Sequence, residues 1–401
     1  MKISNVRLVQ LRGTMEFAGE FWEDRLVRPL DVYPEHRDDG AAWLPKIGEG
    51  RYRMESIFII LETDEGVTGV GGPISLDQAF LIDTQFRQLL VGADPLAIEV
   101  LWDKLYRYSV HGRKGVTMMA ISAIDCALWD LKGRWANAPV YRLLGGPTRT
   151  EIPAYASMLG YSVVPEDAAR RAKEAKAQGY GAQKWFFRSG PGDGKAGFER
   201  NVALAEAVRE AMGDDSDLML DCWMSFDVPY TVKLAEEIEH LNPRWLEEPV
   251  LPDRIESYAE IRRRTSVPIS GGEHEYTRWG LKEFMDADAA DVIQPDIYWC
   301  GGISETLKIC AIASTYDVEV VPHGHSTNAT AHLIASQAAG LCPILEYLVK
   351  WNTIHQWFLK TPLQPVNGIV RLTKQPGLGM ELDEAKIEDQ RELNWGTTHW
   401  S

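Results

Sequence analysis

The sequence is short of positive charge. Its 401 residues include 42 Lys and Arg against 58 Asp and Glu, which gives a formal net charge of −16. A nucleic-acid groove needs a basic face, and an anionic membrane surface attracts cations, so we expect neither partner. A negative chain can still bind an anionic substrate, because a divalent metal and a few Arg or Lys residues reverse the local field.

Cysteines and long apolar runs are also scarce. The five cysteines are odd in number and no pair has Cys-x-x-Cys spacing, which argues against a disulfide framework or a zinc knuckle. No stretch of 18 apolar residues occurs, and residues 1–13 alternate like a strand where a signal peptide would have an apolar core. We therefore expect a reduced, cytoplasmic protein with no membrane span.

The first third of the chain predicts an α+β unit. Residues 3–12 alternate as a strand, and 54–63 and 67–75 flank an Asp-Glu-Gly turn as a hairpin. The polar, Arg- and Gly-rich stretch 13–53 is long for a structureless connection, and such loops are often functional lids. Apolar residues at helical spacing predict helices over 77–91, 96–109 and 116–134.

From about residue 151 short apolar strands alternate with amphipathic helices. Eight strand candidates follow one another, which predicts a (β/α)7–8 TIM-like barrel within the α/β class. After about residue 350 the alternation stops, and we expect this tail to complete the first unit. The predicted domains are a capping domain over 1–134 with its lid loop 13–53, a barrel over 135–350, and a returning segment over 351–401.

Ionisable residues recur at the ends of six successive barrel strands. Their spacing of 23 to 27 residues is close to one βα unit, and the set is Asp221, Glu247, Glu273, Asp296, His323 and Glu346. A single acid at a strand end is about as often a helix cap or a surface residue as it is a site residue. Six ionisable residues at the same point of six successive units are not explained in this way. The carboxyl ends of barrel strands form the active site in this fold.

Carboxylates crowded on one rim repel one another unless a cation lies among them. The three hard oxygen donors Asp221, Glu247 and Glu273 suit octahedral Mg²⁺, completed by waters and a substrate carboxylate. Glu248 directly follows Glu247, and adjacent strand residues point to opposite faces. The even 26-residue spacing favours Glu247 as the ligand.

His323 lies in the segment Val-Val-Pro-His-Gly-His-Ser. A lone histidine there is often structural, but Asp296 stands one βα unit earlier and would fix the tautomer of the ring and raise its basicity. The pair is a candidate base for a proton α to a metal-bound carboxylate. We assign His325 and His332, which follow closely, to loop or helix positions.

Taken together, the motifs resemble the mandelate-racemase-like branch of the enolase superfamily. They are Met-Leu-Asp-Cys-Trp-Met-Ser at 219–225, Trp-Leu-Glu-Glu-Pro at 245–249, Ser-Gly-Gly-Glu-His at 270–274, Gln-Pro-Asp at 294–296 and Val-Val-Pro-His-Gly at 320–324. The match covers nearly the whole chain and is most similar to rhamnonate dehydratase and related acid-sugar dehydratases. The resemblance implies a capped barrel, a homo-oligomer and a sugar acid (an aldonate such as L-rhamnonate or a relative) as the substrate.

The resemblance also implies a role for each site residue. Asp221, Glu247 and Glu273 would bind one Mg²⁺, His323 supported by Asp296 would be the general base, Glu346 would hydrogen-bond the enolised carboxylate, and His274 would lie near the substrate. The reaction implied is loss of the 3-hydroxyl to give a 2-keto-3-deoxy acid.

The second barrel strand departs from the racemases of this superfamily. They carry Lys-x-Lys there, with the second Lys as a base on the opposite face, whereas here Lys184 is followed by Trp185 and then Phe186. A two-base racemisation therefore loses one base. Lys184 itself is either a substrate contact or an ion-pair partner of a metal-site carboxylate.

The lid departs from the rhamnonate group. In that group a histidine that contacts the substrate follows an acidic Trp-x-Asp stretch, but here Trp22-Glu23-Asp24 is followed by Arg25, which puts the exact sugar in doubt. Candidate substrate contacts in the lid are Arg25, Arg51 and Arg53, with Arg28 as a further lid cation. The competing functions are an epimerase, racemase or cycloisomerase of the same superfamily and, from another class, a non-catalytic binding protein that keeps the fold.

Overall fold

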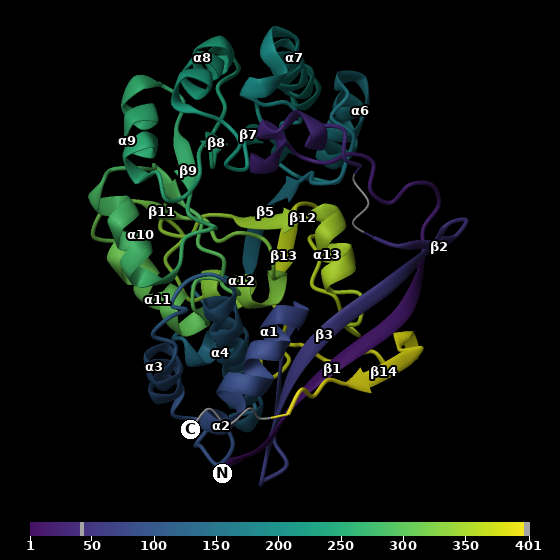
Figure 1. The fold of residues 1–401 in the computed structure, drawn as a ribbon, viewed down its shortest axis with the longest axis vertical. Coiled ribbons are helices and arrows are strands. Elements are labelled where there is room, and N and C mark those ends of the chain that lie inside the picture. The colour runs from purple at the N-terminus through teal and green to yellow at the C-terminus, as the bar shows by residue number, and fades with distance from the viewer. Residues whose placement is uncertain (41–43, 397–401) are drawn as a thin grey trace.

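The computed structural model describes residues 1–40 and 44–396 as a capping domain set against a barrel of parallel strands (Figure 1). The cap is an antiparallel sheet in the order β14-β1-β3-β2, and β4 also pairs with β3, beyond the residues that pair with β2. Its strands are β1 (Ile3–Glu16), β2 (Lys46–Gly48), β3 (Arg51–Thr63), β4 (Thr68–Ile74) and β14 (Asp389–Glu392). Its helices are α1 (Leu76–Leu81), α2 (Arg87–Leu90), α3 (Ile98–Tyr108), α4 (Val116–Trp135) and the short α5 (Val140–Leu143).

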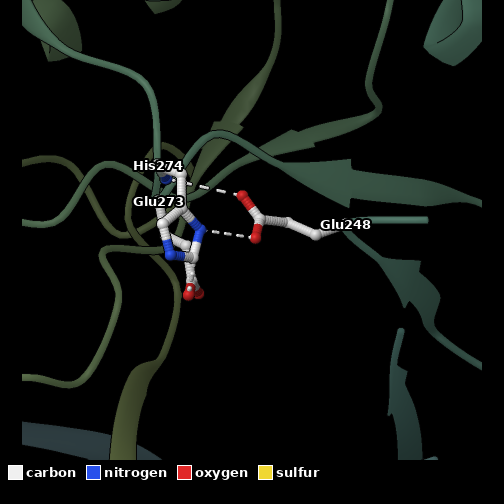
Figure 2. Close-up of side chains that lie close together, drawn as sticks. All are labelled: Glu248, Glu273 and His274. Carbon is white, nitrogen blue, oxygen red and sulfur yellow. Dashed lines mark hydrogen bonds and ion pairs between the residues drawn. The ribbon is translucent and has the colours of Figure 1, made fainter. Parts of the chain in front are cut away.

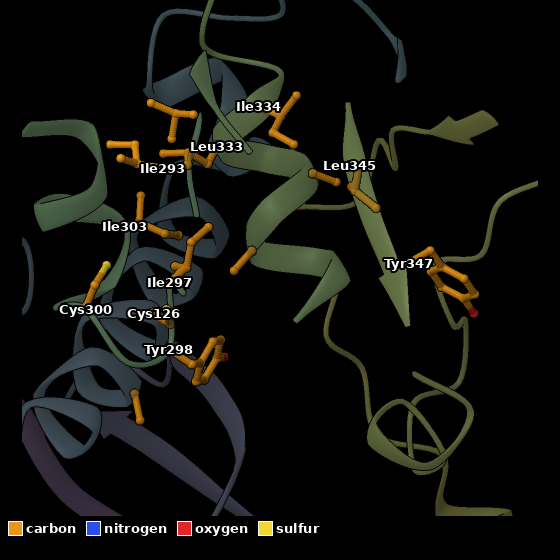
Figure 3. Close-up of a cluster of buried hydrophobic side chains, with 14 of the residues drawn as sticks. Cys126, Ile293, Ile297, Tyr298, Cys300, Ile303, Leu333, Ile334, Leu345 and Tyr347 are labelled. Atoms are coloured by element: carbon orange, nitrogen blue, oxygen red, sulfur yellow. The ribbon is translucent and has the colours of Figure 1, made fainter. Parts of the chain in front are cut away.

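A glycine lets the cap sheet approach α4. A Cβ atom on Gly69 of β4 would lie 2.3 Å from the Ala127 carbonyl and 2.5 Å from Leu131 Cβ, so any side chain would push the sheet away from the helix. Helix α4 is buried over most of its length because it lies between this sheet and the barrel. Figure 3 shows Cys126 of α4 in one cluster with Tyr298 and Ile303 of the barrel, which makes the hydrophobic core continuous across the two domains.

The helix predicted over 77–91 is interrupted. Between α1 and α2 the five residues Ile82–Phe86 form a π-turn. The Thr84 hydroxyl donates to the Phe80 carbonyl at 2.7 Å, and a side chain that bonds back to the preceding turn competes with the regular helical ladder. The spacing of apolar residues does not predict a side-chain hydrogen bond of this kind.

Eight parallel strands form the barrel sheet, in the order β11-β10-β9-β8-β7-β6-β5-β12. They are β5 (Glu151–Ser157), β6 (Ala182–Phe186), β7 (Asp217–Asp221), β8 (Trp245–Glu247), β9 (Ile269–Gly271), β10 (Val292–Ile293), β11 (Glu319–Val320) and β12 (Leu345–Leu348). Where β11 meets the segment before β12, the Val320 N–H donates to the Leu341 carbonyl at 2.8 Å. The predicted fold class, a TIM-like barrel with an α+β cap, is confirmed.

The helices between the strands surround the barrel (Figure 1). They are α6 (Pro165–Ala177), α7 (Gly194–Met212), α8 (Val228–Ile238), α9 (Ile255–Arg264), α10 (Thr277–Asp286), α11 (Gly302–Ala313), α12 (Thr327–Ile334) and α13 (Val349–His355). Their apolar faces pack on the strands and leave the carboxyl-end loops to form the site. No helix in the described part of the chain combines the length and hydropathy that a bilayer span requires.

The segment between β1 and β3 is shorter and more ordered than the 13–53 loop predicted from its polarity. Gly13 to Glu16 pair with Met54 to Arg51, so both strands continue beyond the expected ends. The remaining lid, residues 17–50, carries two 3-10 turns and strand β2 in its described part, namely Pro29–Val32, Pro34–His36 and Lys46–Gly48.

The C-terminal tail makes contact with both domains. Strand β13 (Ile369–Arg371) pairs with the first barrel strand, β5. Strand β14 then pairs antiparallel with β1, with Val9 opposite Glu392 (Figure 1). The tail therefore fixes the cap sheet relative to the barrel.

Candidate active site

Three acidic side chains leave the ends of neighbouring barrel strands. Asp221 ends β7 and lies opposite Glu247, which ends β8, and Glu273 follows two residues after β9. Each of the three residues is at most 3% exposed. Glu273 is close enough to Asp221 to raise its pKa, so the structure brings these carboxylates to one side of the rim.

Lys184 of β6 provides a cation at this rim. Its Nζ lies 3.2 Å from Asp221 Oδ2 and 2.8 Å from Glu346 Oε1, and it also pairs with Glu247 Oε1. The lysine is 1% exposed, and the charges of the three carboxylates outweigh its burial and hold the pKa of Lys184 well above its usual range. Of the two roles left open by the sequence, the structure shows the ion pair with the rim carboxylates.

Asp221 and Glu247 each have one oxygen fixed by the protein. Asp221 Oδ1 accepts the Trp223 N–H at 2.9 Å, and Glu247 Oε2 accepts from the side chains of Trp245 and Gln294, both at 2.8 Å. The second oxygen of each then faces Lys184. Hydrogen bonds to the outer oxygen orient the inner one, as in the supporting shell of a metal site.

The rim carboxylates are unfavourable as isolated anions. Burial raises the pKa of Asp221 to about 6, that of Glu247 to about 8 and that of Glu273 to about 7, despite the opposing charge of Lys184. A group of buried oxygen donors that resists ionisation gains stability from a divalent cation. Three buried carboxylates on one rim fit the preference of Mg²⁺ for hard oxygen ligands.

His323 and Asp296 form a buried pair beyond the ends of β11 and β10. His323 Nδ1 lies 2.7 Å from Asp296 Oδ2, and Asp296 Oδ1 accepts the Tyr298 N–H at 2.7 Å. The second ring nitrogen, Nε2, lies 3.5 Å from Glu273 Oε2. Burial opposes the imidazolium, but Glu273 and Asp296 outweigh it and raise the pKa of His323 to about 10.

Glu346 lies inside β12, one residue after its start, and not at the strand end. Its Oε2 accepts the Gly324 N–H at 2.8 Å, and its Oε1 faces Lys184. The negative charge of Glu346 contributes to the raised pKa of His323. The structure thus connects this carboxylate to both Lys184 and the loop of His323.

Glu248, the neighbour of Glu247 in the sequence, pairs with His274 (Figure 2). Glu248 adopts a positive φ of 42°, and its Oε2 lies 2.7 Å from His274 Nδ1. Burial opposes the charge on His274, but Glu248 raises the pKa of that ring to about 9. Among the described residues, Glu248, Glu273 and His274 are the set whose donor atoms all lie within 4.8 Å. Because His274 already pairs with Glu248, this set is a salt-bridged support behind Glu273.

A cavity of about 480 Å³ opens in front of Glu273 and His323. Its walls are mostly aromatic and aliphatic, with few polar groups, as is usual for a small-molecule site. The lining residues are Trp22, Arg25, Leu26, Arg28, Gly40, Leu159, Trp223, Glu273, Trp299, His323, His325, Leu348 and Trp351. His274 is not among these lining residues of the described chain; its ring packs on Trp223 and Trp299, with centroids 5.9 and 5.4 Å away.

Arg25 lines the cavity but directs its donors into the lid. Its guanidinium pairs with Asp31 at 2.6 and 3.1 Å, and its nitrogens also donate to the carbonyls of Leu26, His36, Arg37 and Asp39 at 2.8 to 3.0 Å. These contacts use every N–H of the side chain. The structure therefore shows Arg25 organising the lid, and a contact of Arg25 with the substrate stays a prediction.

The other lid arginines divide between the cavity and solvent. Arg51 and Arg53 are exposed on β3 and are not among the described residues that line the cavity. Arg28 does line it, and it pairs with Asp31 at 3.0 Å and with Asp39 at 2.8 Å. The structure thus does not bring Arg51 or Arg53 to the site.

Glu23 holds the lid on the barrel. Its carboxylate accepts the Ser162 N–H at 3.0 Å and pairs with Arg171 at 2.8 Å and Lys350 at 3.2 Å. Its backbone N–H donates to the Gly160 carbonyl at 2.7 Å. The lid is therefore closed over the cavity in this structure.

Among the cavity residues that were not predicted from the sequence are His325, Trp299 and Trp351. His325 was assigned only to a loop or helix position, although it follows His323 by two residues on the same rim loop. The rule that rim loops carry the site gives a signal for His325. His332 lies in α12, where its Nδ1 accepts the Tyr141 N–H at 3.1 Å away from the cavity.

Two family models cover most of the chain. Residues 50–145 match the "Mandelate racemase / muconate lactonizing enzyme, N-terminal domain" and residues 167–386 match the "Enolase C-terminal domain-like" family. The chain belongs to the mandelate racemase/muconate lactonizing enzyme family. The resemblance found in the motifs is thus confirmed.

Individual members of this family align over nearly the whole chain. L-rhamnonate dehydratase of Saccharopolyspora erythraea is 33% identical over 396 residues, covering 96% of this chain and 97% of that protein. The crystal structure of rhamnonate dehydratase from Gibberella zeae complexed with Mg is 31% identical, with a TM-score of 0.81 and coverage of 96% and 95%. The 3,6-anhydro-D-galactonate cycloisomerase from Zobellia galactanivorans is 30% identical, with a TM-score of 0.76 and coverage of 97% and 100%.

Proposed function

We propose that the chain is a Mg²⁺-dependent hydro-lyase that dehydrates a sugar acid, an aldonate such as L-rhamnonate or a relative, to the 2-keto-3-deoxy acid. One observation carries the proposal: at the rim that the structure describes, His323 paired with Asp296 is the buried candidate base. On β6, Phe186 occupies the position where a two-base enzyme would place its second lysine. The dehydratases among the similar proteins support the same reaction class.

We assign Asp221, Glu247 and Glu273 as the Mg²⁺ ligands. Their buried oxygens and raised pKa values support this assignment, as does the magnesium in the Gibberella zeae structure. When bound, Mg²⁺ supplies Lewis-acid stabilisation of the charge that develops on the substrate carboxylate. Lys184 would donate to that carboxylate, and Glu346, whose Oε1 lies 2.8 Å from Lys184 Nζ, would hydrogen-bond its enolised form.

His323 would move the proton. Its Nε2 faces the rim carboxylates, while Asp296 fixes Nδ1 and the orientation of the ring. Nε2 takes the proton from C2, and the same nitrogen then gives it to the departing 3-hydroxyl on that face. His323 must be unprotonated before it can accept the C2 proton. The charge of Glu273 is the largest that favours the imidazolium, so a Mg²⁺ held by Glu273 would neutralise that charge and lower the pKa of His323. General acid–base catalysis of this kind contributes about 10²–10⁴-fold.

The closed lid would exclude water from the charged intermediate. The Glu23 carboxylate and backbone hold it to the barrel, and Trp22 and Leu26 of the lid face the cavity. A dry, mostly apolar cavity strengthens the fixed charges and limits side reactions. His274 Nδ1 lies 2.7 Å from Glu248 Oε2 and 3.5 Å from Glu273 Oε1, so its ring would support Glu273 directly.

A screen of aldonates and aldarates with Mg²⁺, which detects 2-keto-3-deoxy acid, tests the proposal. We expect one aldonate to react, His323→Asn to be inactive, and the exposed His240→Asn to keep full activity as a matched control. Magnesium binding by calorimetry to wild type and to Asp221→Asn tests the ligand assignment separately. A wild-type enzyme that binds Mg²⁺ but releases no keto acid from any sugar acid would refute dehydration.

The cycloisomerase among the similar structures marks the competing reaction class. Incorporation of deuterium at C2 in D₂O without net dehydration would favour a racemase or epimerase, and a ring-opened or ring-closed isomer would favour a cycloisomerase. A folded wild type that binds no Mg²⁺ would favour a binding protein. A cytoplasmic location, supported by five free buried cysteines, and a homo-oligomeric state remain predictions.

A further inference from the structure

A cluster of three rings lies at one wall of the cavity. His325 comes from the loop between β11 and α12, and Trp351 and His355 come from α13. The ring centroids of His325 and His355 are 4.4 Å apart in a T-shaped contact, and His325 lies 5.7 Å from Trp351. His325 and Trp351 line the cavity directly.

The cluster contains sealed polar atoms without hydrogen-bond partners among the described residues. They are His325 Nδ1, His355 Nε2 and Trp351 Nε1. Buried polar atoms are nearly always paired, and unpaired ones in native proteins often mark a functional site. Because Nδ1 of His325 is sealed, Nε2 is the ring nitrogen left to reach the cavity that this side chain lines.

The surroundings of His325 favour the neutral form of its ring. Burial, together with the neighbouring His355, lowers the pKa of His325 to about 3. A neutral imidazole nitrogen makes one hydrogen bond and offers no charge to an anion. The two arginines that line the cavity are already paired with Asp31. This wall therefore suits a hydroxyl group and not a second carboxylate.

The indole of Trp299 contacts both His325 and the candidate base, His323. The indole of Trp299 packs on both rings, with centroids 5.1 Å from His323 and 5.4 Å from His325. A sugar acid with C2 at His323 would extend its later carbons along Trp299. These carbons carry the hydroxyls that distinguish one aldonate from another.

We propose that His325 is a specificity-determining residue whose Nε2 hydrogen-bonds a hydroxyl on a carbon beyond C3 of the sugar acid, with His355 and Trp351 holding the ring in place. The inference rests on the proposed function, because it takes a sugar acid as the ligand. It assigns a role to three residues that take no part in the proton transfer.

The test combines changes in the enzyme with matching changes in the substrate. The substrates are the aldonate found in the screen and its monodeoxy analogues, each of which lacks one of the hydroxyls that the parent acid carries beyond C3. We expect wild type to lose about tenfold in kcat/KM for one analogue, mainly through KM, because one neutral hydrogen bond is removed. His325→Phe should treat that analogue and the parent acid alike.

Two further variants separate specificity from structure. His325→Gln keeps a hydrogen-bonding group and should retain part of the discrimination, and the exposed His240→Phe should retain all of it. Equal discrimination by wild type and His325→Phe, or none by wild type, overturns the role of His325 while dehydration stands. Calorimetric measurement of binding to His323→Asn, with and without the change at His325, repeats the comparison in the absence of turnover. If no sugar acid binds or reacts, the proposed function and this inference both fail.

Discussion

Asp125 is buried between the cap and the barrel, and its titration should make the free energy of unfolding depend on pH. It lies on α4 against the start of α11, where its Oδ2 accepts the Ser304 N–H at 3.0 Å. Its Oδ1 has no hydrogen-bond partner among the described residues. Burial raises the pKa of Asp125 to about 7, against the lowering effect of the Ser304 hydrogen bonds.

The magnitude follows from proton linkage. An unfolded aspartate titrates near ~3.9, so a folded pKa of about 7 corresponds to about 4 kcal/mol. Because the folded pKa is raised, the folded state binds more protons between these values. The contribution of Asp125 to stability is then complete below about pH 4 and is lost as the pH rises through about 7.

Asp125→Asn removes this dependence while it keeps the shape of the side chain. We expect the free energy of unfolding of the variant, relative to wild type, to rise by up to about 4 kcal/mol between pH 4 and pH 8. Urea unfolding followed by tryptophan fluorescence across this range measures the difference. The matched Asp253→Asn, on an exposed loop, should give a flat difference. A flat or falling difference for Asp125→Asn would refute the reasoning.

Three further predictions concern the site and its lid. Asp296→Asn should lower kcat by about 10²–10⁴-fold with unchanged far-ultraviolet circular dichroism, since the ring of His323 loses its orienting anion; full activity would rule out the pair. Gly160→Ala should raise KM and speed proteolysis of the lid, because Gly160 has a φ of +84° and a Cβ there would lie 2.7 Å from the Trp22 ring; unchanged KM contradicts the lid contact. Arg25→Lys should lower the stability of the lid by about 3 kcal/mol, measured by hydrogen exchange, because the forked pairing with Asp31 is lost; loss of substrate binding with normal lid protection would instead favour a direct contact.

Much of the barrel was predictable because its pattern is periodic. Each βα unit returns the chain to the same rim, so the 26-residue steps from Asp221 to Glu247 and Glu273 already predict neighbouring carboxylates. The 13–53 loop was less predictable, since strand pairing at both of its ends depends on residues that are far apart in sequence. The cap helix 77–91 was interrupted by a single hydroxyl that bonds to the backbone.

The sequence alone therefore determined the fold class, the family and the order of ionisable groups around the rim. The tertiary structure decided which side chains face the cavity. Arg25 and His325 show the difference: the first turns its charge into the lid, and the second presents a neutral nitrogen to the cavity wall. Spacing fixes where a residue lies along the chain, but the direction and protonation of a side chain depend on what packs around it from distant segments.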